Sequence, residues 1–280
     1  MSVGRVTKKA RAFQYAALVA YVVFLGFPLV WLASTAFKST QEIALGAASF
    51  LPKSPTLENF GDAIRRANLI DAGWNSLQVA VASTVLVTAL ALPAAYGLAR
   101  YKTFLRPVTL GWVLVSQVFP TILIIVPLFL ILKQFQLIDS LPGLTIVYVV
   151  FTLPFALWML IGFVANIPKE LEEAAAVDGA SRLRILVSIV FPLLRPGIVA
   201  TAMFAFIAAW NEFLFALVLI QTPEKVTLPL TLSRFVGAEG QVQLGALAAA
   251  SLLATIPSLF FFGLIQGRLT TGLLSGAVKG

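Results

Sequence analysis

The chain has 280 residues, of which 59% are hydrophobic and only 11% are charged. Soluble globular proteins have about 45–50% apolar and about 25% charged residues, so this chain could not cover a water-facing surface of its size. Lys and Arg outnumber Asp and Glu by 20 to 12, a surplus typical of basic loops held against anionic lipid. The absence of Cys and His excludes disulfides, Cys/His metal sites and Ser-His-Asp catalysis. The composition indicates a membrane protein and removes most enzyme classes.

Six stretches are long and apolar enough to cross a bilayer, which requires about 20 residues in a helix. They are residues 13–36, 76–99, 108–132, 144–165, 198–220 and 244–266. The first is too long for the apolar region of a signal peptide, so we interpret it as a retained helix. With the N-terminus inside, thirteen of the 20 basic residues fall in inner segments and seven in outer loops. We therefore predict an all-α integral membrane protein with one transmembrane domain over residues 1–280, six transmembrane helices and both termini cytoplasmic.

Two predicted outer connections are long, at residues 37–75 and 221–243. The first contains the stretch NFGDAIRRANL, which predicts a short amphipathic helix at the membrane surface. The second is rich in turn-forming residues.

The predicted inner connection, residues 166–197, has the signals of a helix–turn–helix. Pro168 suits a helix start, and the acidic residues that follow lie near the positive end of the helix dipole. Three alanines favour the helix, and Gly179 can adopt the positive φ that ends it. Ser181 can cap a second helix, which we expect Pro192 and Pro196 to stop before the fifth span. The apolar residues of that second helix have the spacing of one stripe: Leu183, Leu186, Val187 and Val190.

The small side chains of the first loop helix would let another surface approach closely, and the flanking acids would orient it. This pattern predicts a docking element. The same residues are also compatible with a hairpin that only connects two spans.

The segment EAAAVDGASRLRILVSIVFP, Glu173 to Pro192, resembles the EAA loop of permease subunits of bacterial ABC importers. The family pattern is E-A-A, three residues, G, nine residues and I-x-L-P, and this chain departs from it only at Phe191, where leucine is usual. Further segments are similar to the carbohydrate branch of the family, the maltose-type importers: TLENFGDAI, Asn75-Ser76, AAYGLARYK, AWNEFLFAL and LLSGAVKG.

The resemblance implies a permease of the bacterial inner membrane that forms half of a pathway for a carbohydrate. Its implied partners are a second homologous permease, two cytoplasmic ATPase subunits and an external solute-binding protein, and no nucleic acid. Because the chain lacks the G-x-x-x-x-G-K-[ST] motif, we expect it to hold no cofactor, with ATP and Mg on the partner ATPase. The residues implied to couple to the ATPase are Glu172, Glu173, Ala174, Ala175, Asp178, Gly179 and Pro192. In the C-terminal tail, Ser275, Lys279 and Gly280 are implied to reach the ATPase subunits.

Polar residues inside the spans are the candidates for the pathway or for contact with the partner permease: Gln117, Trp210, Asn211 and Glu212. Glu212 is the only charged residue well inside a span, and such a group normally faces the bundle interior or water. We favour the alternative interpretation, a structural hydrogen bond between helices or a position near the outer interface. Pro120 and Pro127 predict kinks in the third span.

Three rival functions differ in their sequence requirements. An ABC permease for a non-sugar solute would lack the sugar-type segments. A membrane-embedded enzyme would need a motif such as G-x-G-D, G-x-S-x-G with histidine, or H-E-x-x-H, and the chain contains none of them. A channel or secondary carrier would have no use for an EAA loop.

Overall fold

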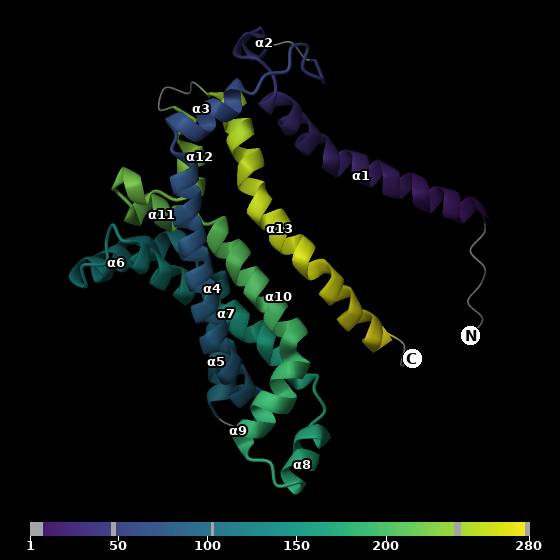
Figure 1. Ribbon diagram of the computed structural model, residues 1–280. Helices are drawn as coiled ribbons and strands as arrows, with labels where there is room; N and C mark the ends of the chain where they lie inside the picture. Colours follow the sequence, from purple (N-terminus) through teal and green to yellow (C-terminus); the bar gives the residue numbers. More distant parts are fainter. Residues whose placement is uncertain (1–7, 46–48, 102–103, 238–241, 278–280) are drawn as a thin grey trace. The chain divides into compact units, whose positions relative to one another are not determined.

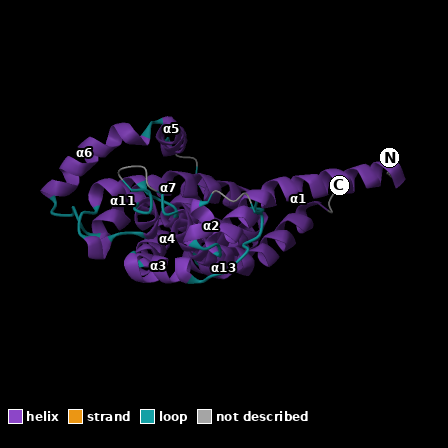
Figure 2. Cartoon of the chain, turned by 90° about the horizontal axis from the view of Figure 1, so that it is seen from above, coloured by secondary structure: helices purple, strands orange, loops and turns teal. Residues whose placement is uncertain are grey.

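The computed structural model describes residues 8–45, 49–101, 104–237 and 242–277, which are helical almost throughout (Figures 1 and 2). Within these ranges the only β pairing is an isolated bridge between Val236 and Val242. The predicted all-α fold is confirmed. The chain forms two compact units, one of residues 1–69 with 232–255 and one of residues 70–231 with 256–280.

The N-terminal part contains three helices: α1 (Lys8–Ala36), α2 (Thr40–Ala44) and α3 (Glu58–Arg66). The middle of the chain contains α4 (Leu69–Arg100), α5 (Leu105–Val118), α6 (Thr121–Gln134), α7 (Leu141–Ala165), α8 (Glu170–Val177), α9 (Arg182–Ile185), the π-helical turn η1 (Leu186–Val190) and α10 (Phe191–Trp210). After these come α11 (Leu214–Leu219), the 3-10 turn η2 (Pro223–Lys225), α12 (Leu228–Ser233) and α13 (Leu244–Ala277).

Five helical segments of the described residues are long and apolar enough to span a membrane: 9–36, 69–100, 141–165, 182–210 and 244–263. A sixth span exists if α5 and α6 are counted together, but they are bent by 104°. The third span, which we predicted as one segment, is therefore broken. Phe119 is extended, with ψ 127°, and Pro120 follows it. A residue before proline is driven out of the helical region, whereas Pro127 lies inside α6 without ending it.

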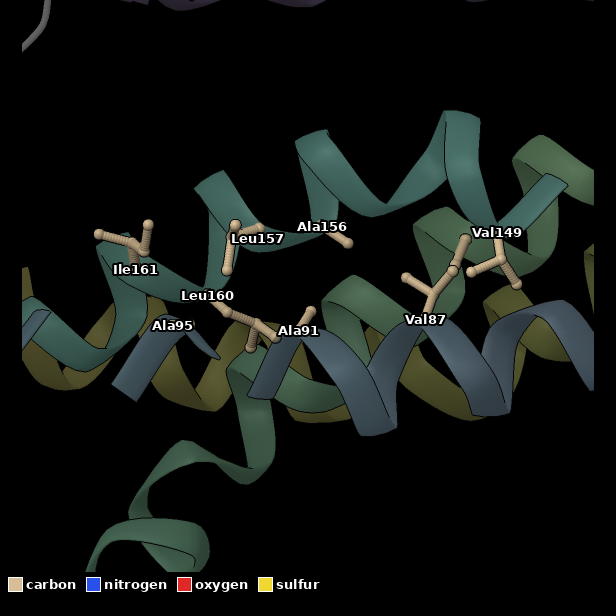
Figure 3. Packing of buried hydrophobic residues seen from close by; sticks show 9 residues of the cluster. Val87, Ala91, Ala95, Val149, Ala156, Leu157, Leu160 and Ile161 are labelled. Atoms are coloured by element: carbon tan, nitrogen blue, oxygen red, sulfur yellow. The ribbon is translucent and has the colours of Figure 1, made fainter. Parts of the chain in front are cut away.

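Small and branched side chains pack α4, α7 and α10 closely together. Figure 3 shows the centre of this core, where Ala91 of α4 lies beside Leu160 of α7 and Val87 of α4 lies beside Val149 of α7. Nearer the loop end, Gly197 of α10 lies so close to Phe163 that an added Cβ would be 2.5 Å from its Cγ. The alanines and this glycine explain why the helix axes can approach, since a larger side chain at Gly197 would push α10 away.

The Asn-Ser pair of the second span ties α4 to a distant loop. The Asn75 amide donates to the carbonyl oxygens of Glu224 and Val226, at 2.8 and 3.1 Å. The Ser76 hydroxyl accepts the backbone N–H of Leu228 at 2.8 Å. These bonds explain the two adjacent polar residues at this point of an apolar helix, because they satisfy backbone groups of the loop that would otherwise be unpaired.

The NFGDAI segment has a comparable structural role in the smaller unit. The Asn59 amide is buried and donates to the carbonyl oxygens of Ala36 and Lys38, at 2.9 and 2.7 Å. Gly245 lies against this amide, and a Cβ there would be 2.3 Å from the Asn59 oxygen. The amphipathic helix that we predicted in this region is present as α3, and its Asn59 holds the end of α1.

Asp139 fastens the α6–α7 connection to the segment after α11. Its carboxylate accepts the backbone N–H groups of Gln221 and Thr222, both at 2.9 Å, and the Thr222 hydroxyl. Lys225 donates to the same carboxylate at 3.1 Å. The hydrogen bonds from Thr222, followed by those from Gln221 and Lys225, lower the pKa of Asp139 well below its ordinary value.

Asp139→Asn is expected to destabilise the chain at neutral pH, because the amide nitrogen of asparagine cannot accept the Thr222 hydroxyl or pair with Lys225. A hydrogen bond to a charged group contributes about 1.5–3 kcal/mol. Because folding lowers the pKa, this stability is fully present above the ordinary carboxyl value of about 3.9 and is lost as the pH falls from there towards the lowered value.

Thermal unfolding in detergent at pH 7 and pH 3.5 measures both effects. The difference in unfolding temperature between wild type and Asp139→Asn should be smaller at pH 3.5 than at pH 7. Glu224 is an exposed carboxylate on the same loop, so Glu224→Gln is the matched control. Its unfolding temperature should stay close to that of the wild type at either pH. A gap that is equal at both pH values would contradict the assignment.

Candidate functional site

The connection between α7 and α10, residues 166–197, contains the predicted helix–turn–helix. Helix α8 ends at Val177 with Asp178 as its C-cap, and Gly179 has φ +82°, the left-handed conformation expected of it. The N–H of Ala180 donates to the carbonyl of Ala175 at 3.0 Å and closes the end of the helix. The Ser181 hydroxyl accepts the N–H of Arg184 and caps α9. We call residues 166–197 the coupling loop.

The expectation that Pro192 and Pro196 stop the second loop helix was wrong. Residues 182–210 form one continuous helical segment that runs through both prolines. The turn η1 explains this, because the N–H of Phe191 bonds to the carbonyl of Leu186, five residues back. This wider turn places Pro192 in the first turn of α10, where a missing N–H costs little. Helix α9 therefore continues into α10 without a break.

The predicted coupling residues divide between two faces of the loop. Glu173, Ala174, Asp178 and Gly179 are exposed. Ala175 is half-buried and packs against a small apolar cluster around Ile185 and Val190, while Pro192 is exposed in α10. Glu172 faces α4, where it bonds Arg100 and Tyr96. The outward face of α8 thus has an acidic side chain near its start and small side chains along the rest of its length.

Several apolar side chains of the coupling loop lie on its surface, which the sequence did not predict. Val177 is 88% exposed and Leu183 is 71% exposed. Leu183, Leu186, Val187 and Val190 have the spacing of one apolar stripe, yet only Val190 is buried. The i, i+3, i+4 spacing could not separate an internal face from a partner face, because both give the same periodicity. Exposed apolar residues together on a loop are typical of a contact surface.

The predicted fifth span also departs from a single helix. Helix α10 ends at Trp210 and α11 begins at Leu214. Glu212 lies in the break, where its carboxylate accepts the N–H groups of Phe215 and Ala216, at 2.8 and 3.3 Å. An acidic side chain at a helix N-terminus satisfies N–H groups that have no helical partner. Glu212 therefore makes local backbone bonds, which accounts for a carboxylate at this depth.

A cavity of about 150 Å³ lies next to this break, between α5, α7, α10 and α11. Gln117 and Glu212 both line it, together with Tyr148, whose hydroxyl is buried. The rest of the wall is largely aromatic: Phe151, Phe155, Phe204 and Phe215. Two residues singled out from distant spans thus share one wall, and a buried polar group faces the same region.

The other pathway candidates lie elsewhere. Trp210 is buried and stacks on Phe206, with ring centroids 5.8 Å apart. Asn211 is exposed, and its amide donates to the carbonyl of Ile207. Neither lines the cavity. In the C-terminal tail, Ser275 belongs to α13, which runs to Ala277, and Lys279 and Gly280 lie outside the described residues.

Residues 88–273 match the family described as the inner membrane component of binding-protein-dependent transport systems. An ABC transporter permease protein of Streptomyces antibioticus, ORF1, is 56% identical over 82% of this chain and 100% of its own length. The diacetylchitobiose uptake permease DasC of Streptomyces coelicolor is 37% identical over 94% of this chain and 96% of its own. The trehalose transport permease SugB of Mycobacterium tuberculosis is 35% identical over 96% and 98%.

The fold agrees with these relatives. The chain matches a chain in the crystal structure of a bacterial ABC transporter that imports alginate, with a TM-score of 0.79 over 95% of this chain and 99% of the other, at 20% identity. The class of protein is an integral membrane transport component. The chain belongs to the family of inner membrane permeases of binding-protein-dependent ABC transport systems.

Proposed function

We propose that this chain forms one half of the transmembrane pathway of an ABC importer for a carbohydrate. The observation that carries the proposal is the coupling loop, in which Gly179 ends a largely exposed, small-residue helix and turns the chain into α9. The relatives named for diacetylchitobiose and trehalose support a sugar as the solute. A second family member would form the other half of the pathway.

The proposal assigns the remaining partners to particular surfaces. Two ATPase subunits, which bind ATP and Mg, dock at the cytoplasmic face, and this chain offers one of them the exposed residues Glu173, Ala174, Val177 and Leu183. A solute-binding protein docks at the opposite face. A related structure contains the alginate transporter with a pentasaccharide-bound periplasmic protein, which supports this partner. Both termini are then cytoplasmic, and the C-terminal tail including Ser275 lies on the ATPase side.

The cavity beside Glu212 is the proposed point of solute contact within this chain. Gln117, Tyr148 and Glu212 offer polar groups, and phenylalanine rings form much of the rest of the wall. Polar groups set among aromatic side chains are the usual composition of a small-molecule site. We place Trp210 and Asn211 outside this contact, because neither lines the cavity.

Purification of the complex from detergent, followed by reconstitution, tests the proposal. An ATPase and a second permease should copurify, and sugar uptake into the vesicles should require ATP and the loaded binding protein. Because the chain has no cysteine, Ala176→Cys and Glu224→Cys report topology without further changes. An impermeant thiol reagent on intact cells should label only the second variant. Uptake without ATP, or labelling at residue 176, would refute the proposal.

Glu173→Lys is expected to lower the amount of copurified ATPase severalfold. The change reverses the charge at the exposed start of α8, where the dipole effect alone is about 0.3–1 kcal/mol. Glu170→Lys is the matched control, because it makes the same charge change in the same helical turn. Equal losses in both variants would attribute the effect to the helix dipole, and normal copurification in Glu173→Lys would exclude a docking role.

A further inference from the structure

One side chain of the coupling loop is bonded to the transmembrane core instead of facing outward. Glu172 of α8 accepts the Nε–H of Arg100 at 2.6 Å on one carboxylate oxygen. Its other oxygen accepts the Tyr96 hydroxyl at 2.7 Å. Tyr96 and Arg100 lie one helical turn apart at the end of α4, so both bonds join α8 to the same helix end.

The arrangement is too enclosed for an ordinary surface ion pair. The side chains of Arg100 and Glu172 are only 7% and 14% exposed. Arg100 also donates to the carbonyl oxygen of Ile167 at 2.9 Å. The guanidinium therefore holds both the beginning of the coupling loop and the first turn of α8. Buried charges persist when each has a partner and further hydrogen bonds, as both do here.

The two halves of the coupling loop are thus attached to different helices. Helix α9 continues through η1 into α10, which ends at Trp210 beside the break that contains Glu212. Helix α8 has no such continuation, because Gly179 separates it from α9. Its polar bonds to α4 run through Glu172, and α4 carries Val87 and Ala91 into the core against α7 (Figure 3).

We propose that Tyr96, Arg100 and Glu172 form a strut that transmits displacement of α8 to α4. On this basis Glu172 is a positioning residue for transport and not a contact with the ATPase, which distinguishes it from the neighbouring, exposed Glu173. A helix that moved without the strut would slide past α4, and α10 alone would respond. The inference rests on the proposed function, since it requires an ATPase that moves α8.

Glu172→Gln tests the strut in the reconstituted complex. Copurified ATPase should remain at the wild-type level, because the exposed face of α8 is unchanged. The stimulation of ATP hydrolysis by sugar-loaded binding protein, and uptake, should fall by about tenfold or more, the size of a typical coupling between sites. Tyr96→Phe keeps the ion pair and removes one hydrogen bond, so its loss should be smaller.

The double variant Arg100→Gln with Glu172→Gln separates transmission from simple anchoring. It removes both charges, so no unpaired charge is left buried, and it remains informative if the single variant folds poorly. If the three residues transmit movement, the ATPase should stay attached in this variant but its hydrolysis of ATP should not be stimulated by the loaded binding protein. Restored stimulation in the double variant, normal uptake in Glu172→Gln, or loss of ATPase equal to that in Glu173→Lys would each overturn the inference. Absence of an ATPase from the wild-type preparation would instead refute the proposed function.

Discussion

Gly179→Val is expected to abolish transport while leaving the chain in the membrane. Gly179 has φ +82°, and a β-branched residue in the left-handed region meets a penalty of roughly 1–2 kcal/mol or more. An energy of this size changes a conformational ratio by about 5–30-fold. The turn would open and α8 would leave its place on α4 and on the cluster around Ile185. Uptake and the response of the ATPase to the loaded binding protein measure the loss.

Steric crowding does not contribute to this effect, since a Cβ at residue 179 would meet no atom within 4 Å. The order of substitutions is therefore diagnostic. Asparagine adopts the left-handed region more readily than other residues with a Cβ, so Gly179→Asn should retain much of the activity, Gly179→Ala less and Gly179→Val least. Equal activity of all three variants would show that the positive φ does not matter, and equal loss would point to contact with a partner at this position.

Glu212→Leu is expected to impair both assembly and transport. The carboxylate satisfies the N–H groups of Phe215 and Ala216, and both residues are buried. Leucine would leave these groups without a partner, at a cost of about 1–3 kcal/mol for each. In lipid the penalty is not relieved by water, so α11 should lose its first turn. The yield of folded chain and its thermal unfolding in detergent measure the damage.

Glu212→Gln separates the helix cap from contact with solute. Its amide oxygen can still accept one backbone N–H, so its stability should lie between that of wild type and Glu212→Leu. If the cavity contacts the sugar, Glu212→Gln should also change the rate of uptake at equal amounts of folded complex. Gln117→Leu, at the same cavity and without a capping role, should then change uptake alone. Wild-type stability of Glu212→Leu would contradict the capping role.

The sequence by itself determined the features that depend on a few consecutive residues. Hydropathy and length predicted the membrane helices, because the bilayer imposes the same requirement wherever a segment lies in the fold. The turn of the coupling loop could be predicted because a positive φ selects glycine and a helix start selects a side-chain acceptor, as Gly179 and Ser181 provide. These signals also carried the resemblance on which the function was recognised.

The tertiary structure decided everything that depends on a partner far along the chain. The sequence shows a proline at residue 192 but not the wide turn η1 that accommodates it. It also shows two adjacent acids, Glu172 and Glu173, but not that their side chains point in different directions. Glu172 turns inward because Arg100, 72 residues away, ends α4 at that place, while Glu173 finds no such partner. In the same way Gln117 of α5 and Glu212, which follows α10, line one cavity that α7 also borders. A periodic pattern specifies which residues share a face, and only packing specifies what that face meets.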